Sequence, residues 1–501
     1  MPPCISSDDT NINNDSSSTV NQSSKACHWA VVGGGVMGLV AALRLAEKGE
    51  RVTVIESSSS LGGLTSSWEL GARDPFYEKE SAITELVEWD KFYHVVLLSD
   101  SRIRSILSLL GLDDQIQWVQ TKTGFYSEGK LYPLSSSIDF LKFPPLNLYQ
   151  KFRLGSTIFL GSKIRNWRSM EGMLVGEWLQ RWSGKSTYQK IWKPLLKAKL
   201  GLAYERTAAS FIWAYIDRMY KARRSGMKRE LFGYVPGGYK RIIDGLEKHL
   251  KSAGVTIIEN APVQQVAPKA PSNGSPSSSA KASDNNSLIE IAFGTDSDLK
   301  QQSFDRVIMT SPYRVIEAAC PWLSSSERQK LSSTEYLGVV CTSLLMDKPL
   351  TGYYVTNIID EWVPLTGIIE MGSILPPEKL GGNYLVYLPQ YMLSNDSRLH
   401  EPEEVVHERC LATLERMYPE KSIRQSVKSI QTARASFVMA LPTLNFSESR
   451  PPVLLSQTGV YLLNSARIVK GTLNVNETLE LLEEEFNGVI WPNHLTRLNQ
   501  S

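Results

Sequence analysis

The stretch AVVGGGVMGLVAALRLAEKGERVTVIE, from Ala30 to Glu56, decides the fold of this chain. It opens with an apolar run, as a buried parallel strand requires. Gly33, Gly35 and Gly38 then fill the spacing G-x-G-x-x-G. In this spacing the first glycine permits a tight turn, the second lets the backbone approach a pyrophosphate, and the third lets the next helix pack closely. We expect that helix over Val36 to Lys48, because its apolar residues share one broad face.

A second strand is expected over Arg51 to Ile55, and Glu56 follows it directly. A carboxylate about 20 residues after the glycines is where a ribose hydroxyl is bound. The glycine spacing alone is weak, because glycine clusters are common in ordinary turns. Here strand, glycines, helix, strand and carboxylate occur in the required order, so the sequence predicts a dinucleotide site.

Length and composition place limits on the rest. A chain of 501 residues predicts two or three domains. Its net charge of +2 does not call for a nucleic-acid partner. The five cysteines lack C-x-x-C spacing, and the six histidines form no H-x-x-x-H pair. We therefore expect no metal site, no disulfide framework, and a reducing, cytoplasmic location.

Two segments of low complexity are expected to lie outside the folded core. Residues 1–28 are rich in Ser, Asn and Asp, and they lack the apolar region of a secretory signal. The tract from Pro268 to Ser287 lies between strand-like segments, so we expect a solvated loop within one sheet. No stretch approaches the roughly 18 apolar residues of a transmembrane helix.

The remaining chain divides into blocks of different character. Residues 101–229 are expected to be mainly helical, whereas residues 336–440 mix strands with an amphipathic helix over Pro402 to Met417. A last strand, GVYLLNS, precedes a final helix, NETLELLEEEF. We expect a discontinuous nucleotide domain made of residues 29–100, 229–315 and 452–490, and a substrate domain made of residues 101–228 and 316–451.

Beyond the glycine turn, four segments resemble the superfamily of FAD-dependent amine oxidases and protoporphyrinogen oxidases. They are LGGL after Glu56, FYHVVLLSD from Phe92, the segment FGYVPGGYKRIIDGLEKHL from Phe232, and TGVYLLNSARIVKGTLNVNETLEL from Thr458. The resemblance implies an α/β fold, in which a Rossmann-like FAD-binding domain is joined to a mixed α+β substrate domain. It implies FAD as the cofactor.

The same resemblance assigns site residues. Gly33, Gly35 and Gly38 would surround the FAD pyrophosphate, and Glu56 would bind the adenosine ribose. The other implied cofactor residues are Gly62, Gly63, Val263 (through its backbone, to adenine), Asn464, Gly471, Thr472 and Asn474. Independently of the resemblance, Asn474 or Asn476 can cap the final helix, whose N-terminus suits an anionic or electron-rich ligand. Leu64 follows the glycine pair where many amine oxidases have arginine, which weakens a true amine oxidase assignment more than it weakens FAD binding. The loop ARIVKGTLN resembles the protoporphyrinogen oxidase-like branch better.

A flavin performs the redox step itself, so no catalytic triad is required. We expect dehydrogenation of a C–N or C–C bond of a small-molecule substrate. Three side chains are catalytic candidates: His94 for proton exchange, Lys199 for orienting a water or an anion, and Arg434 for a carboxylate or phosphate. Each has a structural alternative: a hydrogen-bonded interface histidine, a surface lysine, and an arginine that ties the two domains together.

Other functions and partners stay open at this point. One alternative is a redox-neutral flavoenzyme resembling UDP-galactopyranose mutase, and another is a non-catalytic nucleotide-binding scaffold. The basic clusters at 163–168 and 221–229 are ordinarily solvated faces. Together with FLKFPPLNLYQKF they are also suited to an anionic lipid surface or a phosphorylated substrate. The absence of an RNA-binding motif argues against nucleic acid. The substrate and the oligomeric state cannot be predicted from the sequence.

Overall fold

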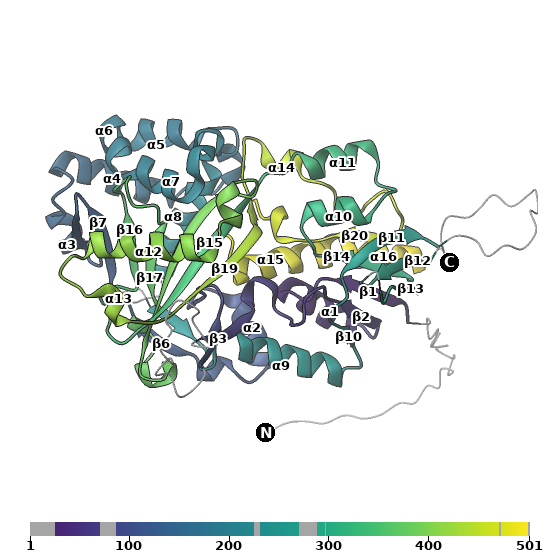
Figure 1. Cartoon of the computed structure of the whole chain (residues 1–501). Coiled ribbons are helices and arrows are strands. Elements are labelled where there is room, and N and C mark those ends of the chain that lie inside the picture. The colour runs from purple at the N-terminus through teal and green to yellow at the C-terminus, as the bar shows by residue number, and fades with distance from the viewer. Residues whose placement is uncertain are drawn as a thin grey trace, which may run out of the picture.

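The computed structural model describes residues 26–70, 87–224, 231–269, 288–295, 297–469 and 472–498, without the side chains of 221–224. Residues 1–25 of the expected tail, most of the Ser-rich tract, Gly471 and the side chains of the basic cluster 221–229 therefore lie outside what can be described. The chain forms an elongated molecule with two lobes (Figure 1). Each lobe is built around its own β-sheet.

The first lobe contains a parallel five-stranded sheet in the order β10-β2-β1-β14-β20. Its strands are β1 (His28–Val32), β2 (Arg51–Ile55), β10 (Thr256–Ile258), β14 (Arg306–Met309) and β20 (Val460–Leu462). The strand β1 begins at His28, inside the expected tail. Residues far apart in sequence thus form one sheet, as a doubly wound fold does.

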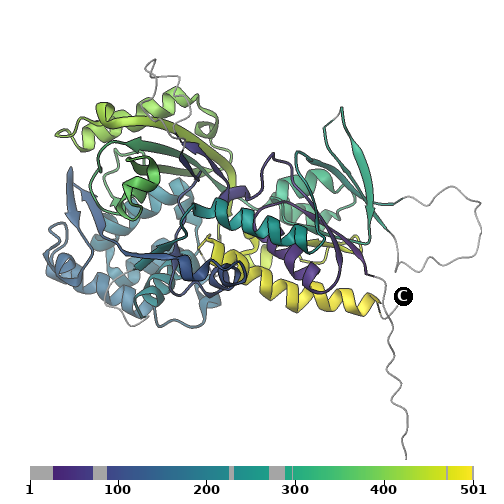
Figure 2. The ribbon, with the colours of Figure 1, turned by 90° about the horizontal axis from the view of Figure 1, so that it is seen from below.

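Both faces of this sheet are covered. Trp29 and Val31 face a core that includes apolar residues of α1 (Val36–Glu47), α9 (Gly238–Ser252) and α15 (Val475–Glu485). Ala30 and Val32 face the opposite core, with the antiparallel sheet β11-β12-β13 and α10 (Tyr313–Ala319). In Figure 2 the C-terminal helices lie close to the N-terminal α1. Apolar residues on both faces explain why β1 is a continuous hydrophobic run.

The antiparallel sheet consists of β11 (Val263–Pro268), β12 (Ile289–Phe293) and β13 (Lys300–Phe304). The Ser-rich tract connects β11 to β12, which are neighbours in this sheet. At its base the Lys269 N–H donates to the carbonyl of Leu288 at 2.8 Å. The two ends of the tract are therefore held together.

The second lobe contains a seven-stranded sheet in the order β19-β15-β18-β17-β16-β7-β8. The strands are β7 (Thr123–Ser127), β8 (Lys130–Pro133), β15 (Tyr336–Met346), β16 (Val355–Ile358), β17 (Gly367–Glu370), β18 (Tyr384–Leu393) and β19 (Val427–Ala440). One face packs on the helices α4 (Leu148–Gly161), α5 (Val175–Ser183), α7 (Lys193–Leu200) and α8 (Ser210–Arg224). The other face packs on α12 (Glu403–Met417).

The block expected to be mainly helical also contains the strands β6 (Gln117–Gln120), β7 and β8. Glu128 and Gly129, with φ of 53° and 70°, form the turn between β7 and β8. Positive φ at both positions is what a tight hairpin requires. The hairpin extends the sheet of the second lobe through the parallel pair β7–β16, a contact between distant segments.

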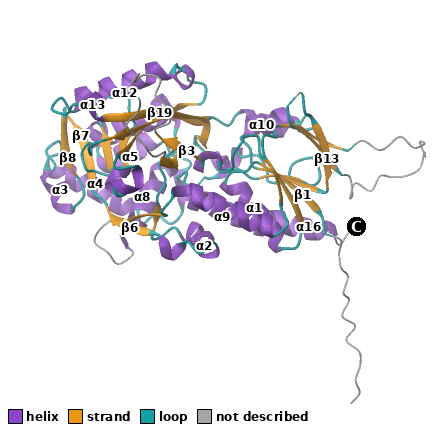
Figure 3. Cartoon of the chain, turned by 60° about the horizontal axis from the view of Figure 1, so that its bottom comes forward, coloured by secondary structure: helices purple, strands orange, loops and turns teal. Residues whose placement is uncertain are grey.

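Shorter elements complete the fold. They are β3 (Ser67–Leu70), β4 (Val87–Asp90), β5 (Val96–Leu97), β9 (Leu231–Tyr234), α2 (Ser101–Leu109), α3 (Ser137–Lys142), α6 (Lys185–Thr187), α11 (Ser325–Ser332), α13 (Ile423–Ser426), α14 (Phe446–Ser449) and α16 (Trp491–Leu498). Figure 3 shows the β1 sheet at one end of the molecule and α3 and α4 at the other. Over the part of the chain that is described, no helix has the length and apolar character needed to cross a membrane.

The two ends of the described chain meet at Glu50. Its Oε2 accepts the N–H of Cys27 at 2.7 Å, and its Oε1 lies 3.1 Å from Nε2 of the buried His494. One potential metal-ligand atom from each of the three side chains lies within 4.8 Å of the others. These two contacts of Glu50 join α16 to the start of β1.

Candidate functional site

The carboxyl ends of four parallel strands bring the predicted cofactor residues together. Gly33 follows β1, Glu56 follows β2, Thr310 follows β14, and Asn464 comes two residues after β20. In open α/β sheets, ligands bind outside the carboxyl ends of the strands. This edge of the sheet is therefore the candidate site.

The glycine turn forms an open cradle at this edge. Gly33 has φ of +113°, and a Cβ on Gly38 would lie 1.9 Å from the carbonyl oxygen of Gly33. By contrast, a Cβ on Gly35 would meet nothing closer than the carbonyl oxygen of Gly62 at 3.9 Å. Gly35 caps α1 without a side-chain hydrogen bond, and the first turn has no acidic residue. The first N–H groups of α1 are thus suited to an anionic pyrophosphate.

Glu56 is buried and held in place by the glycine turn. Its Oε2 accepts the N–H of Gly34 at 2.6 Å, and its Oε1 accepts the N–H of Ser58 at 2.8 Å. Its backbone carbonyl accepts the N–H of Ala261 at 2.8 Å. Because Ala261 is two residues before Val263, this bond brings the start of β11 beside the carboxylate. Glu56 and Val263 thus border one region, as the sequence predicts for the adenosine end.

The glycine pair Gly62 and Gly63 packs directly on the first turn. The Gly62 N–H donates to the carbonyl of Gly34 at 2.9 Å. Both residues of the pair have positive φ, 109° and 56°. A Cβ on Gly63 would lie 3.4 Å from Cα of Gly35. The two glycine motifs therefore form one continuous backbone surface.

The C-terminal motif joins the same edge through Asn464. Its Nδ2 donates to the carbonyl of Ser311 at 2.7 Å, and its Oδ1 accepts the N–H of Ala466 at 3.2 Å. The adjacent Thr310 donates from Oγ1 to the carbonyl of Val32 at 2.8 Å. Asn464 is thereby connected to the residue that precedes the glycine turn.

Asn474, and not Asn476, caps the helix α15. Its Oδ1 accepts the N–H of Glu477 at 3.0 Å, and its Nδ2 donates to the carbonyl of Thr472 at 2.8 Å. Asn476 instead accepts the N–H of Arg102 at 2.8 Å, at the start of α2. The N-terminus of α15 is therefore ordered by Asn474.

The residues at this edge fit a dinucleotide cofactor. The glycine cradle admits a pyrophosphate, the α1 N-terminus offers free N–H groups, and Glu56 provides a fixed carboxylate for a ribose.

Lys199 belongs to a second cluster, formed with two tyrosines. Its Nζ lies 3.0 Å from the centroid of the Tyr391 ring. The Tyr391 hydroxyl is 3.2 Å from the hydroxyl of Tyr93. Burial lowers the pKa of Lys199 to about 7 and raises the pKa of Tyr93 well above its usual value. Near neutral pH, Lys199 can therefore gain or lose a proton, whereas both phenols stay protonated.

His94 follows Tyr93 and is held as a neutral imidazole. Its Nδ1 lies 2.9 Å from the carbonyl oxygen of Phe92, which can only accept, so Nδ1 carries the proton. The ring packs on Tyr239 with centroids 4.9 Å apart. Burial lowers the pKa of His94 to about 4. His94 therefore presents an unprotonated Nε2 near neutral pH.

Asp90, which the sequence did not single out, is a buried carboxyl beside this cluster, because its partners Tyr239 and Tyr387 pack on His94 and Tyr93. It is 2% exposed, and its Oδ1 accepts the N–H of Tyr239 at 2.8 Å. Its carbonyl oxygen accepts the Tyr387 hydroxyl at 2.5 Å. Burial raises the pKa of this carboxyl to about 8. The only sequence signal was its place in EWDKFYH, directly before the predicted FYH segment.

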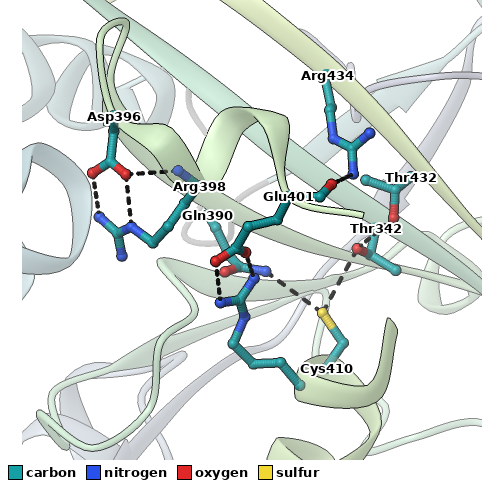
Figure 4. A network of polar contacts seen from close by, with 9 residues as sticks. Thr342, Gln390, Asp396, Arg398, Glu401, Cys410, Thr432 and Arg434 are labelled. Atoms are coloured by element: carbon teal, nitrogen blue, oxygen red, sulfur yellow. Dashed lines mark hydrogen bonds and ion pairs between the residues drawn. The ribbon is translucent and has the colours of Figure 1, made fainter. Parts of the chain in front are cut away.

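The structure does not bring Arg434 to His94 or Lys199. In the sheet, Arg434 is paired with Val340, whereas Tyr391 is paired with Val339. Side chains alternate along strands, so Tyr391 and Arg434 lie on opposite faces of the sheet. Arg434 donates from Nη2 to the carbonyl of Glu401 at 2.6 Å, on the α12 side (Figure 4).

The loop with the glycine pair, the segment before α15 and the Lys199 cluster border the same hydrophobic core. Leu64 beside the glycine pair and Leu473 beside Asn474 pack on this core, as do Tyr93 and Tyr391. The core lies on the face of the sheet opposite to α12. The dinucleotide edge and the Lys199 cluster therefore both border this core.

Comparison with known proteins identifies the cofactor. Residues 37–462 match the family model described as flavin containing amine oxidoreductase. No curated protein sequence matches the chain significantly.

Solved structures share the fold over nearly the whole chain. A provisionally named protoporphyrinogen oxidase from Exiguobacterium is 16% identical with a TM-score of 0.65, covering 93% of this chain and 99% of its own. A fatty acid isomerase from P. acnes is 12% identical with a TM-score of 0.63, covering 92% and 98%. Cyclohexylamine oxidase from Brevibacterium oxydans is 12% identical with a TM-score of 0.61, covering 93% and 99%.

Proposed function

This chain belongs to the flavin-containing amine oxidoreductase family, and we propose that it dehydrogenates a C–N or C–C bond of a small molecule bound at the Lys199 cluster. It is a FAD-dependent oxidoreductase. The bound FAD supplies the acceptor for a hydride equivalent from the substrate. The protein must therefore orient the substrate, keep water out, and take up the proton that is released.

Lys199 is the residue that we assign to the proton. Dehydrogenation removes a hydride equivalent from one substrate atom and a proton from its neighbour. Because its pKa is lowered to about 7, Lys199 has a neutral fraction near neutral pH that can accept this proton at Nζ. Burial is the only cause of the lowered pKa, with no charged partner contributing. The placement of Lys199 against the Tyr391 ring, in a chain of this flavin family, is the observation that carries the proposal.

Tyr93 and Tyr391 would form the wall of the substrate site. Their rings present apolar surface, and their paired hydroxyls can turn toward a polar substrate atom. His94 would offer Nε2 as a hydrogen-bond acceptor. Such a site suits an apolar substrate with a few polar groups, as a protoporphyrinogen oxidase-like activity requires.

The test is to mix the protein anaerobically with amines or reduced tetrapyrroles as substrates. The rate at which the bound flavin is reduced is measured from the loss of its visible absorbance. Between about pH 6 and pH 8 the neutral fraction of a group with a pKa near 7 rises about tenfold, so the reduction rate of the wild type should rise tenfold. Lys199→Met should slow reduction by about 10²–10⁴-fold and remove this pH dependence.

Lys197→Met is the matched control. Lys197 lies on the same helix but is exposed and paired with Glu361 at 2.7 Å. The flavin of the Lys197→Met protein should be reduced at the wild-type rate and with the wild-type pH dependence. A Lys199→Met protein that also does so would refute the assigned role. Substrate turnover only after prior flavin reduction would favour the redox-neutral alternative instead.

A further inference from the structure

The helix α4 turns large apolar side chains toward solvent, while its buried side holds polar residues beside the core residue Leu154. Leu148, Tyr149 and Phe152 are 74%, 66% and 71% exposed, whereas Gln150 and Lys151 are buried. A surface helix ordinarily shows the reverse pattern, with its polar face toward water. The exposed side of α4 is therefore built for contact with something other than water.

Hydrogen bonds fix α4 in this orientation. The buried Nζ of Lys151 donates to the carbonyl of Leu141 at 2.6 Å. Gln150 donates from Nε2 to Oγ of Ser186 in α6 at 2.7 Å. Turning the helix to hide its apolar side would leave these polar groups without their partners. The exposure of the apolar side chains is thus a stable property of the fold.

The apolar surface is larger than one helix. Its α3 part consists of Ile138 and Leu141, 63% and 59% exposed, and the second half of α4 adds Phe159 and Leu160. Phe152 and Phe159 line an open hollow on α4. We call the exposed apolar side chains of these two helices the α3–α4 surface. It lies at the end of the molecule away from the β1 sheet (Figure 3).

Positive charge surrounds this surface. Residues 137–170 include six basic residues, of which Lys151 is buried, and one acidic residue, in a chain of +2 overall. Lys142 and Lys163 are exposed at the ends of α3 and α4, and Nζ of Lys163 lies 5.2 Å from the Phe159 ring centroid. The one carboxylate, Asp139, accepts the N–H groups of Ser135 and Ser136 at the start of α3.

This combination matches an anionic lipid surface. Exposed aromatic and leucine side chains bury themselves at the boundary between headgroups and acyl chains, while flanking lysines and arginines contact the headgroups. A second copy of the chain is a poor fit, because a symmetric dimer would place one basic surface against another. A helix of 14 residues is about 21 Å long, so it would lie on the bilayer and not span it.

We propose that the α3–α4 surface docks this protein on anionic membranes. This docking requires neither a particular substrate nor the proposed role of Lys199. The test uses the full chain with FAD bound, centrifuged with vesicles of phosphatidylcholine alone or with about 30% phosphatidylserine. The wild type should bind the anionic vesicles, and added salt should weaken the binding.

Two variants separate the apolar and the electrostatic contributions. The double variant Phe152→Ser/Phe159→Ser should bind at least about tenfold more weakly at every salt concentration. The double variant Lys142→Glu/Lys163→Glu should lose the preference for anionic vesicles. Both should keep the wild-type flavin spectrum, because these side chains point to solvent. The control Leu299→Ser/Val405→Ser changes two exposed apolar residues outside the surface, 52% and 49% exposed, and should bind as the wild type does.

Three results would overturn the proposal. The first is no binding to either kind of vesicle. The second is binding that Phe152→Ser/Phe159→Ser leaves unchanged. The third, measured by light scattering after size-exclusion chromatography, is a lipid-independent dimer that the same double variant converts to monomers, because the surface would then join two copies of the chain.

Discussion

Replacing Asp90 by Asn should change how the stability of this protein depends on pH. Asp90 is 2% exposed, and burial raises its pKa from 3.8 to about 8. Between these two values the folded protein keeps the proton and the unfolded chain releases it. The contribution of Asp90 to the free energy of unfolding is therefore complete below pH 3.8 and is lost as the pH rises toward 8.

The size of the effect follows from the pKa values. Each pH unit inside this window costs about 1.4 kcal/mol, so the wild type should lose roughly 4 kcal/mol between about pH 5 and pH 8 from this group. Asn cannot titrate, although its oxygen can still accept the N–H of Tyr239. The buried amide of Asn adds a cost of about 1–3 kcal/mol that is the same at every pH. The role of Asp90 is therefore identified by how steeply the free energy of unfolding changes with pH, and not by the constant difference between the two proteins.

The assay is urea unfolding of the FAD-saturated protein at several pH values, for the wild type and Asp90→Asn. The free energy of unfolding of the variant, minus that of the wild type, should grow by roughly 4 kcal/mol from about pH 5 to pH 8. The control is Asp244→Asn, since Asp244 is exposed in a surface ion pair with Lys240. Its effect should stay below about 1 kcal/mol. Parallel curves for Asp90→Asn and the wild type would refute the reasoning, because Asp90 would then be ionised in the folded protein.

Three further substitutions test the cofactor site and its support. Gly38→Ala should abolish FAD binding, measured by visible absorbance after reconstitution, because its Cβ would lie 1.9 Å from the carbonyl oxygen of Gly33; a yellow protein would contradict this. Glu56→Gln should weaken FAD binding by about 10–100-fold, measured by equilibrium dialysis, because a hydrogen bond to a charged group is lost. An unchanged affinity would show that Glu56 does not bind the ribose. Glu485→Gln should lower the free energy of unfolding in urea by roughly 3–5 kcal/mol, because the buried Arg467, 6% exposed, loses its ion-pair partner at 2.8 Å. An unchanged unfolding midpoint would show that this ion pair contributes nothing to stability.

The nucleotide-binding edge could be predicted because its information is local. The turn, α1, β2 and Glu56 follow one another within 27 residues, and each is specified by a short-range rule. The helix expected over Val36 to Lys48 is α1, Val36–Glu47. The strand expected over Arg51 to Ile55 has those bounds.

The Lys199 cluster depends on information that is not local. Tyr93, Lys199 and Tyr391 come from three distant segments, and no spacing rule connects them. Alternation within β19 assigns Arg434 to one face of the sheet, but only the packing of α12 decides which face that is. Asp90 is similar: its raised pKa results from burial by elements that follow it in the sequence. For these residues, tertiary packing determines the chemistry.

The strand order of the first lobe has a consequence for synthesis on the ribosome. The strands β1, β14 and β20 are neighbours in the sheet but lie far apart in sequence. The strand β20 leaves the ribosome roughly 430 residues after β1. At about 5–20 residues per second, this delay is roughly 20–90 s. Until then β14 has an unpaired edge, and the segment that carries Asn464 and Asn474 is missing. The nascent chain therefore completes its cofactor site only after β20 and the start of α15 have been synthesised, and a chaperone that shields the β14 edge should increase the yield of flavin-loaded protein.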